Sequence, residues 1–229
     1  MTGRPVEIVP LDVGTFTFPA DEPWPGEDGV VVAYAIHRRE GVLLFDTGFG
    51  FGNPFLDDRY HPAPRTMTDV LGGAGIRLAE VDVMANCHLH PDHAGQNAAM
   101  TGIPIHVQRA ELAIARAGGY TIEDWVDGPG VEYIEADGDH DLVPGIRIVA
   151  TPGHSPGHQS LVVETADGPV VLSGQAVYGL DEWRGTPGRE GASSARDRAA
   201  YDASLARLHA IDPVRVLFAH DRRPWEKSR

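Results

Sequence analysis

Short apolar runs separated by turn-forming residues recur along the whole chain, and they predict strands and helices that alternate in two similar halves. The predicted strands, which are rich in β-branched residues, span 6–11, 30–37, 42–45, 81–85, 103–107, 146–150, 161–164, 170–172 and 214–218. Helices are predicted over 66–74, 109–117 and 199–210, and a further helix is predicted to begin over residues 91–98.

Four segments lack this pattern and are predicted to be loops or turns. Residues 19–29 are rich in proline, glycine and acidic side chains, and residues 49–64 form a connection of similar composition. Residues 137–141 are predicted to be a polar turn in which His140 faces solvent. Residues 181–196 carry glycine and proline without apolar periodicity, so we interpret them either as a mobile lid or as a disordered loop.

The amino-acid composition indicates a globular protein and argues against nucleic acid and membranes as partners. The chain has 229 residues, of which 42% are hydrophobic and 23% charged, and no linker divides it, so we expect one globular domain over 1–229. The net charge of -14 repels polyanions, which excludes nucleic acid as an expected partner. No apolar run approaches the roughly 20 residues needed to span a bilayer. Since no apolar signal core opens the chain either, we expect a cytoplasmic protein that does not bind membranes.

The segment 86–95 carries the clearest chemical signal. It places three imidazoles and one carboxylate within six positions, namely His88, His90, Asp92 and His93. At the end of a strand, His88 and His90 would point to the same face, and the other two would follow from the turn. Imidazole and carboxylate are ligands of zinc, iron and manganese. A pH sensor or a chance cluster is the alternative, but burying four such groups is costly without a cation, so the segment predicts a metal site.

Two neighbouring residues are open to two interpretations each. Cys87 is the single cysteine, which excludes an internal disulfide, and it could be a metal ligand or a small buried core residue. Strand alternation would point Cys87 away from the face shared by His88 and His90, which favours the core. Asp46 ends a predicted strand just before a Thr-Gly pair, so it is either a turn former or a carboxylate directed into a site.

The second half of the chain supplies further candidate ligands. Residues 151–158 contain two Pro-Gly pairs, which prevent regular structure and stiffen the loop that carries His154 and His158. A stiff loop is a good mount for a metal ligand. Three other polar side chains come after predicted strands, namely Gln175, Tyr178 and His220.

Together these segments resemble the metallo-β-lactamase superfamily and, within it, the N-acyl homoserine lactone lactonases. The resemblance rests on His88-Leu-His-Pro-Asp-His93, Asp46-Thr-Gly48, Pro152-Gly-His-Ser-Pro-Gly-His158 and His220. Weaker cues to the subfamily are Val107-Gln-Arg-Ala-Glu111, Gln159-Ser-Leu161, Tyr178 and His220-Asp-Arg-Arg-Pro-Trp225. The resemblance implies an α/β fold, a four-layer αββα sandwich with a metal site at one edge.

The resemblance also implies a ligand set. His88, His90 and His154 match the first metal site of the family, and Asp92, His93 and His220 match the second. His158 is not a ligand in the family, and Asp46 would orient the ligands. We therefore expect one or two zinc ions, with iron or manganese as alternatives.

Gln175 departs from the family pattern, in which a Gly-Asp pair ends this strand and its carboxylate bridges the two metals. The amide of Gln175 can coordinate through its oxygen, but it removes one negative charge between two dications. Gln175 is therefore retained as a candidate ligand, and occupancy by one metal or by two is left open.

The resemblance implies a metal-dependent hydrolase of a small ester, lactone or thioester. Metal-bound hydroxide would attack the carbonyl carbon, Tyr178 would help to stabilise the oxyanion, and Asp92 would pass a proton to the departing oxygen. Two alternatives come from other classes: a mononuclear non-haem iron enzyme acting on a small molecule, and a catalytically weak binding protein of the same fold. The expected partner is a small-molecule substrate, and the oligomeric state is open, a homodimer included.

Overall fold

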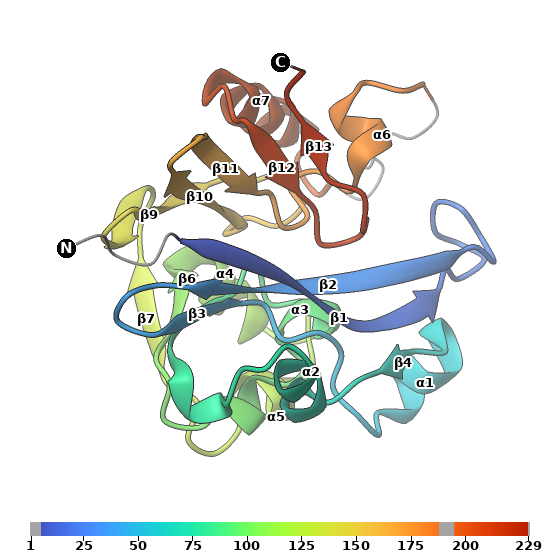
Figure 1. The fold of residues 1–229 in the computed structure, drawn as a ribbon. Coiled ribbons are helices and arrows are strands. Elements are labelled where there is room, and N and C mark those ends of the chain that lie inside the picture. The colour runs from blue at the N-terminus through green and yellow to red at the C-terminus, as the bar shows by residue number, and fades with distance from the viewer. Residues whose placement is uncertain (1–5, 188–194, 229) are drawn as a thin grey trace. The chain divides into compact units, whose positions relative to one another are not determined.

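The computed structural model describes residues 6–187 and 195–228, and the chain divides into two compact units. The first unit comprises Met1–His106 and Ala115–Ile134, and the second comprises Val107–Ile114 and Glu135–Arg229. The elements of both are labelled in Figure 1. The expectation of one domain over the whole chain stays a prediction.

The first unit is built on a seven-stranded mixed sheet, in which the strand order is β4-β1-β2-β3-β5-β6-β7. Its strands are β1 (Glu7–Thr17), β2 (Asp28–His37), β3 (Val42–Phe45), β4 (Ala63–Pro64), β5 (Val81–Ala85), β6 (Ile105–Gln108) and β7 (Tyr133–Ala136). The last two residues of β6 and of β7 belong to the second unit. Its helices are α1 (Pro54–Tyr60), α2 (Met67–Gly73), α3 (Pro91–Ala94), α5 (Glu123–Val126) and the 3-10 helices η1 (Leu78–Glu80) and η2 (Asn97–Met100).

The centre of this sheet consists of strands that are buried on both faces, which explains why β3 is the uninterrupted apolar run Val-Leu-Leu-Phe. β3 pairs in parallel with β5, and Phe45 lies opposite Ala85. Because parallel strands end at the same edge of a sheet, the residues that follow Phe45 and Ala85 become neighbours. This pairing brings Asp46 beside the histidine segment.

The second unit is built on a six-stranded sheet with the order β13-β12-β11-β10-β9-β8. Its strands are β8 (His140–Val143), β9 (Ile146–Ala150), β10 (Gln159–Thr165), β11 (Gly168–Leu172), β12 (Arg215–Leu217) and β13 (Trp225–Glu226). Its helices are α4 (Arg109–Ala115), α6 (Leu180–Trp183) and α7 (Arg198–Ala210). The last residue of α4, Ala115, belongs to the first unit.

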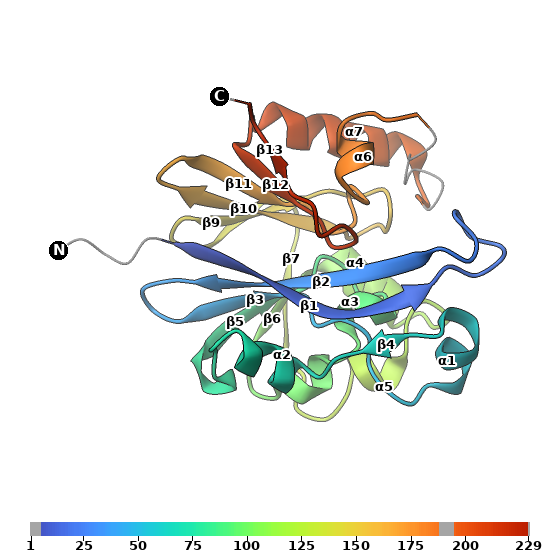
Figure 2. The ribbon, with the colours of Figure 1, turned by 45° about the vertical axis from the view of Figure 1, so that its right-hand side comes forward.

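The core of the second unit lies between its sheet and the helices α6 and α7, which accompany β11 and β12 in both ribbon views (Figures 1 and 2). Trp183 of α6 and Leu208 of α7 pack with the strand residues Val162, Val171 and Val216. Burial of each large apolar side chain contributes on the order of 1.5–3 kcal/mol, so this layer anchors both helices to the sheet.

Several sequence predictions need correction. The connection over 49–64 contains α1, whose N-cap Asn53 accepts the Leu56 N–H and precedes a proline in the first turn. The helix expected over 91–98 is only α3, and the turn expected at His140 is the half-buried start of β8. A chain with the right turn residues can still pair as a strand when a neighbour such as β9 is available.

The lid or disordered loop expected over 181–196 is also revised. Its first residues belong to α6, where Trp183 is buried in the core rather than placed in a loop. The rest of that interpretation falls partly on residues 188–194, which lie outside the described residues.

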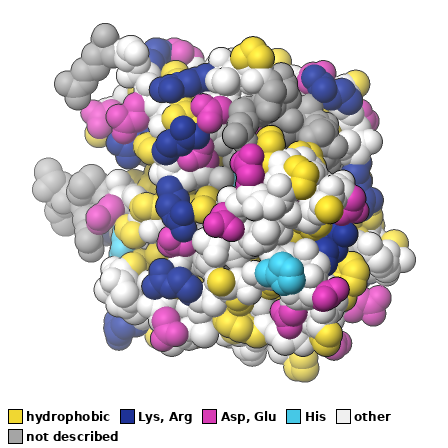
Figure 3. Space-filling view, turned by 90° about the vertical axis from the view of Figure 1, so that its right-hand side faces the viewer, with side chains coloured by type: hydrophobic (Ala, Val, Ile, Leu, Met, Phe, Trp, Pro, Cys, Tyr) yellow, Lys and Arg dark blue, Asp and Glu magenta, His cyan; other side chains and the backbone are white. Residues whose placement is uncertain are grey.

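Two surface properties bear on the predicted partners. On the face shown in Figure 3, acidic and basic side chains are intermingled, and surface ion pairs such as Arg116–Asp127 reflect this mixing. Each such pair contributes only about 0–1 kcal/mol. Within 6–187 and 195–228, no helix is both long and apolar enough to cross a bilayer.

Candidate metal centre

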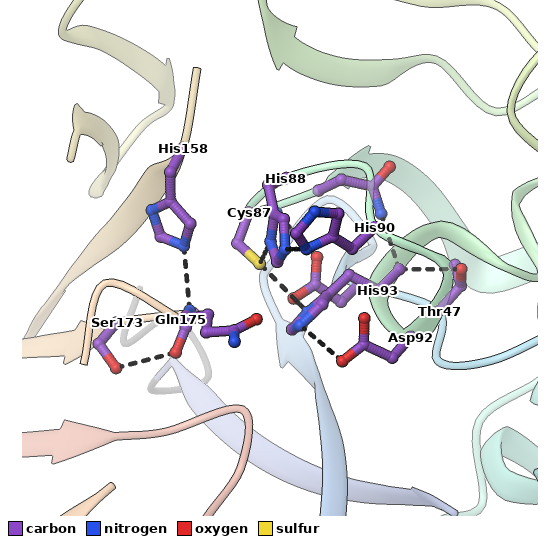
Figure 4. Close-up of polar contacts among 12 residues, drawn as sticks. Thr47, Cys87, His88, His90, Asp92, His93, His158, Ser173 and Gln175 are labelled. Carbon is purple, nitrogen blue, oxygen red and sulfur yellow. Dashed lines mark hydrogen bonds and ion pairs between the residues drawn. The ribbon is translucent and has the colours of Figure 1, made fainter. Parts of the chain in front are cut away.

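The histidine segment of the first unit follows β5 and forms what we call the first donor set: His88, His90, Asp92 and His93. The Nε2 atom of His88 lies 2.9 Å from the Nδ1 atom of His90 (Figure 4). The Nε2 atom of His93 lies 3.4 Å from an Asp92 carboxylate oxygen. The segment thus presents two pairs of ligand atoms.

These separations match what a bound metal requires. Zinc binds imidazole nitrogen and carboxylate oxygen at about 2.0–2.2 Å, so two ligand atoms on one tetrahedral ion lie about 3.3 Å apart. His88 and His93 are fully buried, whereas His90 and Asp92 are half-buried. The donor atoms therefore fit a metal by chemistry and by spacing, with two protein ligands already in place at each of two positions.

The Asp46 carboxylate contacts His93 and the backbone of the histidine segment. One carboxylate oxygen lies 3.0 Å from the Nδ1 atom of His93, and the other accepts the Cys87 backbone N–H at 2.7 Å. With Nδ1 engaged, the His93 ring turns its Nε2 atom towards Asp92, the arrangement in which a carboxylate fixes a metal-binding imidazole. Asp46 has the positive φ of a turn residue, +67°, and its carboxylate is also directed at His93, so the two interpretations hold together. Its role in orienting a metal ligand stays a prediction.

Cys87 is a fully buried core residue, as predicted, but the alternation argument behind that prediction is wrong. β5 ends at Ala85, so strand geometry no longer applies, and the Cys87 sulfur lies 3.1 Å from His88 Nδ1 and 3.2 Å from His93 Nδ1. Burial raises the pKa of the Cys87 thiol well above its usual range, and the Asp46 carboxylate adds to this shift. The thiol therefore keeps its proton in the protein alone.

The field in the first donor set favours a positive charge. Burial by itself would lower the pKa of His93, but the neighbouring Asp92 and Asp46 carboxylates favour the protonated ring and raise this pKa well above its usual range. A position that retains a proton so strongly also attracts a dication that can replace it. The electrostatics thus agree with the geometry.

Buried amides hold the surrounding loops, and the sequence analysis missed them. The Gln96 side chain donates to the carbonyls of Thr47, Phe49 and Arg65 at 2.9–3.1 Å. Asn86 donates to the His93 carbonyl at 3.1 Å and accepts from Asn97 at 2.9 Å. Buried amides that satisfy backbone groups stiffen a site. Their signal in the sequence was the three amide residues flanking the histidines.

The second unit positions three further candidate ligands, which we call the second donor set: His154, Gln175 and His220. β11 and β12 are parallel, with Leu172 opposite Leu217, so the residues that follow them emerge at one edge. His220 stacks on the ring of Tyr178, with centroids 4.6 Å apart and an angle of 18°. In each unit, a pair of parallel strands thus brings candidate site residues to one edge of the sheet.

His158 has both ring nitrogens engaged, which fixes its protonation state. The Gln175 backbone N–H can only donate, so the Nε2 atom of His158, 3.0 Å away, accepts (Figure 4). The Nδ1 atom then carries the proton and donates to the Thr151 hydroxyl at 2.8 Å. Thr151 lies 2.9 Å from Ser160, which donates to the Ser173 carbonyl at 2.9 Å. His158 therefore ties the His154 loop to the turn that carries Gln175.

Tyr178 is held by a buried acid in α6. Glu182 accepts the Tyr178 backbone N–H at 2.5 Å and also the hydroxyl of Tyr201 in α7. Burial, together with the Glu182 carboxylate, raises the pKa of Tyr201 above its usual range, so Tyr201 stays a donor. The Tyr178 backbone is thereby fixed from two helices. Metal binding that shares ligands between the two donor sets stays a prediction.

Comparison with known proteins places the chain in context. A model of the metallo-beta-lactamase superfamily matches residues 26–229. An N-acyl homoserine lactonase of a Bacillus species is 35% identical over 216 residues, which cover 86% of this chain and 84% of the relative. An N-acyl homoserine lactonase of Bacillus thuringiensis subsp. kurstaki is 34% identical over 161 residues, or 65% of this chain and 64% of the relative.

A solved N-acyl homoserine lactone hydrolase, with the product N-hexanoyl-L-homoserine bound at its catalytic metal centre, is similar in structure. It superposes with a TM-score of 0.77 at 29% identity, over 97% of this chain and 95% of the other. The metallo-β-lactamase fold predicted from the sequence is confirmed.

Proposed function

Because the chain belongs to the metallo-β-lactamase superfamily and, within it, to the N-acyl homoserine lactonases, we propose that it is a zinc-dependent hydrolase that opens the ring of N-acyl homoserine lactones. The observation that carries this proposal is the first donor set, whose paired ligand atoms have the spacing of a metal centre. Relatives of the same family, one with product at its metal centre, supply the substrate class.

We assign the ligands as the family pattern suggests. His88, His90 and His154 would hold one zinc ion, and Asp92, His93 and His220 a second, with Gln175 as an additional oxygen donor. When bound, zinc acts as a Lewis acid and lowers the pKa of its water to near 7. Asp46 then serves to keep the His93 ring in its ligating orientation.

Two side chains act directly on the substrate in this proposal. Asp92 is half-buried, and its carboxylate would accept the proton released by the attacking water and pass it to the ring oxygen that departs when the lactone opens. The Tyr178 hydroxyl would donate a hydrogen bond to the oxygen of the carbonyl under attack. The stacked His220 ring and the buried Glu182 hold Tyr178, so little ordering is needed when substrate binds.

The other two functions considered from the sequence are less well supported. A mononuclear iron enzyme of this fold would be expected to use an aspartate at the position of Gln175. A catalytically weak binding protein would not need the Asp46–His93 contact, which in this proposal orients a metal ligand. A cytoplasmic location, a homodimer and the absence of nucleic-acid binding stay predictions.

Hydrolysis of N-hexanoyl homoserine lactone, followed by acid release with a pH indicator, tests the proposal. Zinc-loaded protein should hydrolyse the lactone, a chelator should abolish this activity, and added zinc should restore it. The corresponding open-ring N-acyl homoserine serves as the control that should release no acid. Zinc-loaded protein that opens lactones of neither short nor long acyl chains would refute the assignment.

A further inference from the structure

The loop that carries His154 rests on a buried acid from α4. Glu111 lies in the first turn of that helix and is fully buried. One of its carboxylate oxygens accepts the Ser155 hydroxyl at 2.6 Å and the Gly157 backbone N–H at 3.2 Å. Both donors lie within three positions of His154, and Ser155 is its direct neighbour. Glu111 therefore contacts the loop where His154 leaves it.

Two glycines allow this close packing. A Cβ atom on Gly157 would lie 2.2 Å from the backbone nitrogen of Glu111. On the other side, Gly153 has a φ of +141°, and a Cβ there would lie 2.4 Å from the Tyr201 backbone in α7. His154 is thus carried between two points at which the loop touches a helix without an intervening side chain.

The buried carboxylate of Glu111 makes stronger hydrogen bonds to the loop than a neutral side chain would. A buried charge costs free energy unless it is hydrogen-bonded, so a loop that needed only packing would be served by an apolar residue. Hydrogen bonds to an ionised acceptor are roughly twice as strong as neutral ones and fix geometry more tightly. The short bond from Ser155 is of this kind.

The neighbouring polar residues brace the same loop. Gln108 donates to the Gln159 side chain at 2.9 Å, just beyond the end of the loop, and pairs with both backbone groups of Gly138. The segment 107–111 takes no part in the proposed reaction. Its Gln108 and Glu111 side chains give it a structural role, which is to brace the loop that carries His154.

We propose that Glu111 is a positioning residue for His154, whose buried carboxylate holds the Ser155–Gly157 turn and thereby aims the His154 ring. Glu111 touches neither the substrate nor a metal. This inference rests on the proposed function, in which His154 is a zinc ligand. Loss of the Glu111 carboxylate would lower zinc affinity because the His154 ring would be misdirected, while the number of zinc ligands would stay the same.

Zinc affinity, measured by competition with a chromophoric chelator, and the visible absorption of the cobalt-substituted protein test the inference. Glu111→Ala should weaken zinc binding by about 10- to 100-fold, the usual loss when a residue behind a ligand is removed. Glu111→Gln keeps the volume and an acceptor oxygen, so it should lose less. Both should shift the cobalt spectrum, which a purely structural residue would not do. Glu164→Gln, an exposed acid on β10, is the matched control and should bind zinc as the wild type does.

The outcomes separate this inference from the proposed function. If His154→Ala binds zinc as tightly as the wild type, the ligand assignment itself is wrong. If His154→Ala loses zinc but both Glu111 variants bind it within about twofold of the wild type, with an unchanged cobalt spectrum, the positioning role is refuted. Should Glu111→Ala fail to fold, Glu111→Gln and Ser155→Ala decide the matter, because each leaves the packing of α4 in place.

Discussion

The first donor set lies within six consecutive positions, whereas the second is spread from His154 to His220. In both units a parallel pair of strands ends at one edge, β3 with β5 and β11 with β12, and the functional residues follow these ends, except His154, which follows β9. In the first set Asp46 contacts a ligand directly, and Thr47 and Gln96 hold the surrounding loop through further long-range hydrogen bonds. In the second set the His158 ring, Glu182 and Glu111 all hold the loops. Both sets depend on buried polar contacts, but the first takes its four ligands from one segment, whereas the second assembles three ligands from separate segments.

The sharpest test of this comparison removes one ligand from each set. His90→Ala and His154→Ala should each lose most of the tightly bound zinc, because three imidazoles are needed to fix a tetrahedral ion with an open position. Metal analysis by mass spectrometry after dialysis measures the content. His37→Ala, at the end of β2, is the control and should keep its zinc. Full zinc content in both ligand variants would show that neither set holds the metal.

Asp92 distinguishes binding from catalysis within the first set. Asp92→Asn keeps the size and one oxygen of the side chain but loses the transferable proton, so the rate of lactone opening should fall by roughly 100-fold or more. The zinc at the first position, held by His88, His90 and His154, should change much less. Rate and zinc content are measured on the same preparation, and an unchanged rate would remove Asp92 from the mechanism.

Gln175 is the residue at which the second set departs from its family. Gln175→Asp should raise the zinc affinity of the second position by roughly tenfold or more, and with it the occupancy at a fixed free zinc concentration, because a carboxylate attracts both dications. Calorimetric titration with zinc gives the two affinities. Gln175→Asn, which keeps the amide and the charge, is the control. Two zinc ions bound equally tightly in the wild type and in Gln175→Asp would show that this position never limited metal binding.

The smallest expected effect concerns the support of α6 behind Tyr178. Burial opposes ionisation of Asp221, but Arg223 and two backbone N–H groups, one from Leu180, hold its pKa below the usual value. A lowered pKa stabilises the fold above about pH 4, and this contribution is lost as the pH falls further. Asp221→Asn should therefore cost about 1 kcal/mol at pH 6, and the difference should shrink below pH 4.

Urea unfolding at pH 6 and pH 3.5 checks this expectation. Asp167→Asn, at the exposed turn between β10 and β11, provides the matched control and should unfold like the wild type at both values. A difference between Asp221→Asn and the wild type that stays constant with pH would mean that the charge of Asp221 is not what stabilises α6.

Sequence alone determined the features that depend on local spacing. The run over 42–45 predicted β3 to the residue, because a strand buried on both faces is continuously apolar. The segment 81–85 also predicted β5 to the residue, although its Asp82 is exposed. The four residues of the first donor set were identified for a similar reason, since ligand atoms so close along the chain can converge without distant partners.

Tertiary structure decided what depends on pairing and on where elements stop. The direction of the Cys87 side chain was mispredicted because alternation holds only to Ala85, the last residue of β5, and local sequence does not mark that end. Asp46 acquired its partner through the parallel pairing of β3 with β5, which joins segments some forty positions apart. Glu111 lies in an ordinary helical pattern, and only the approach of Gly157 to α4 turns it into a support for His154. Strand register and close packing arise from contacts across the whole chain, so no window of sequence contains them.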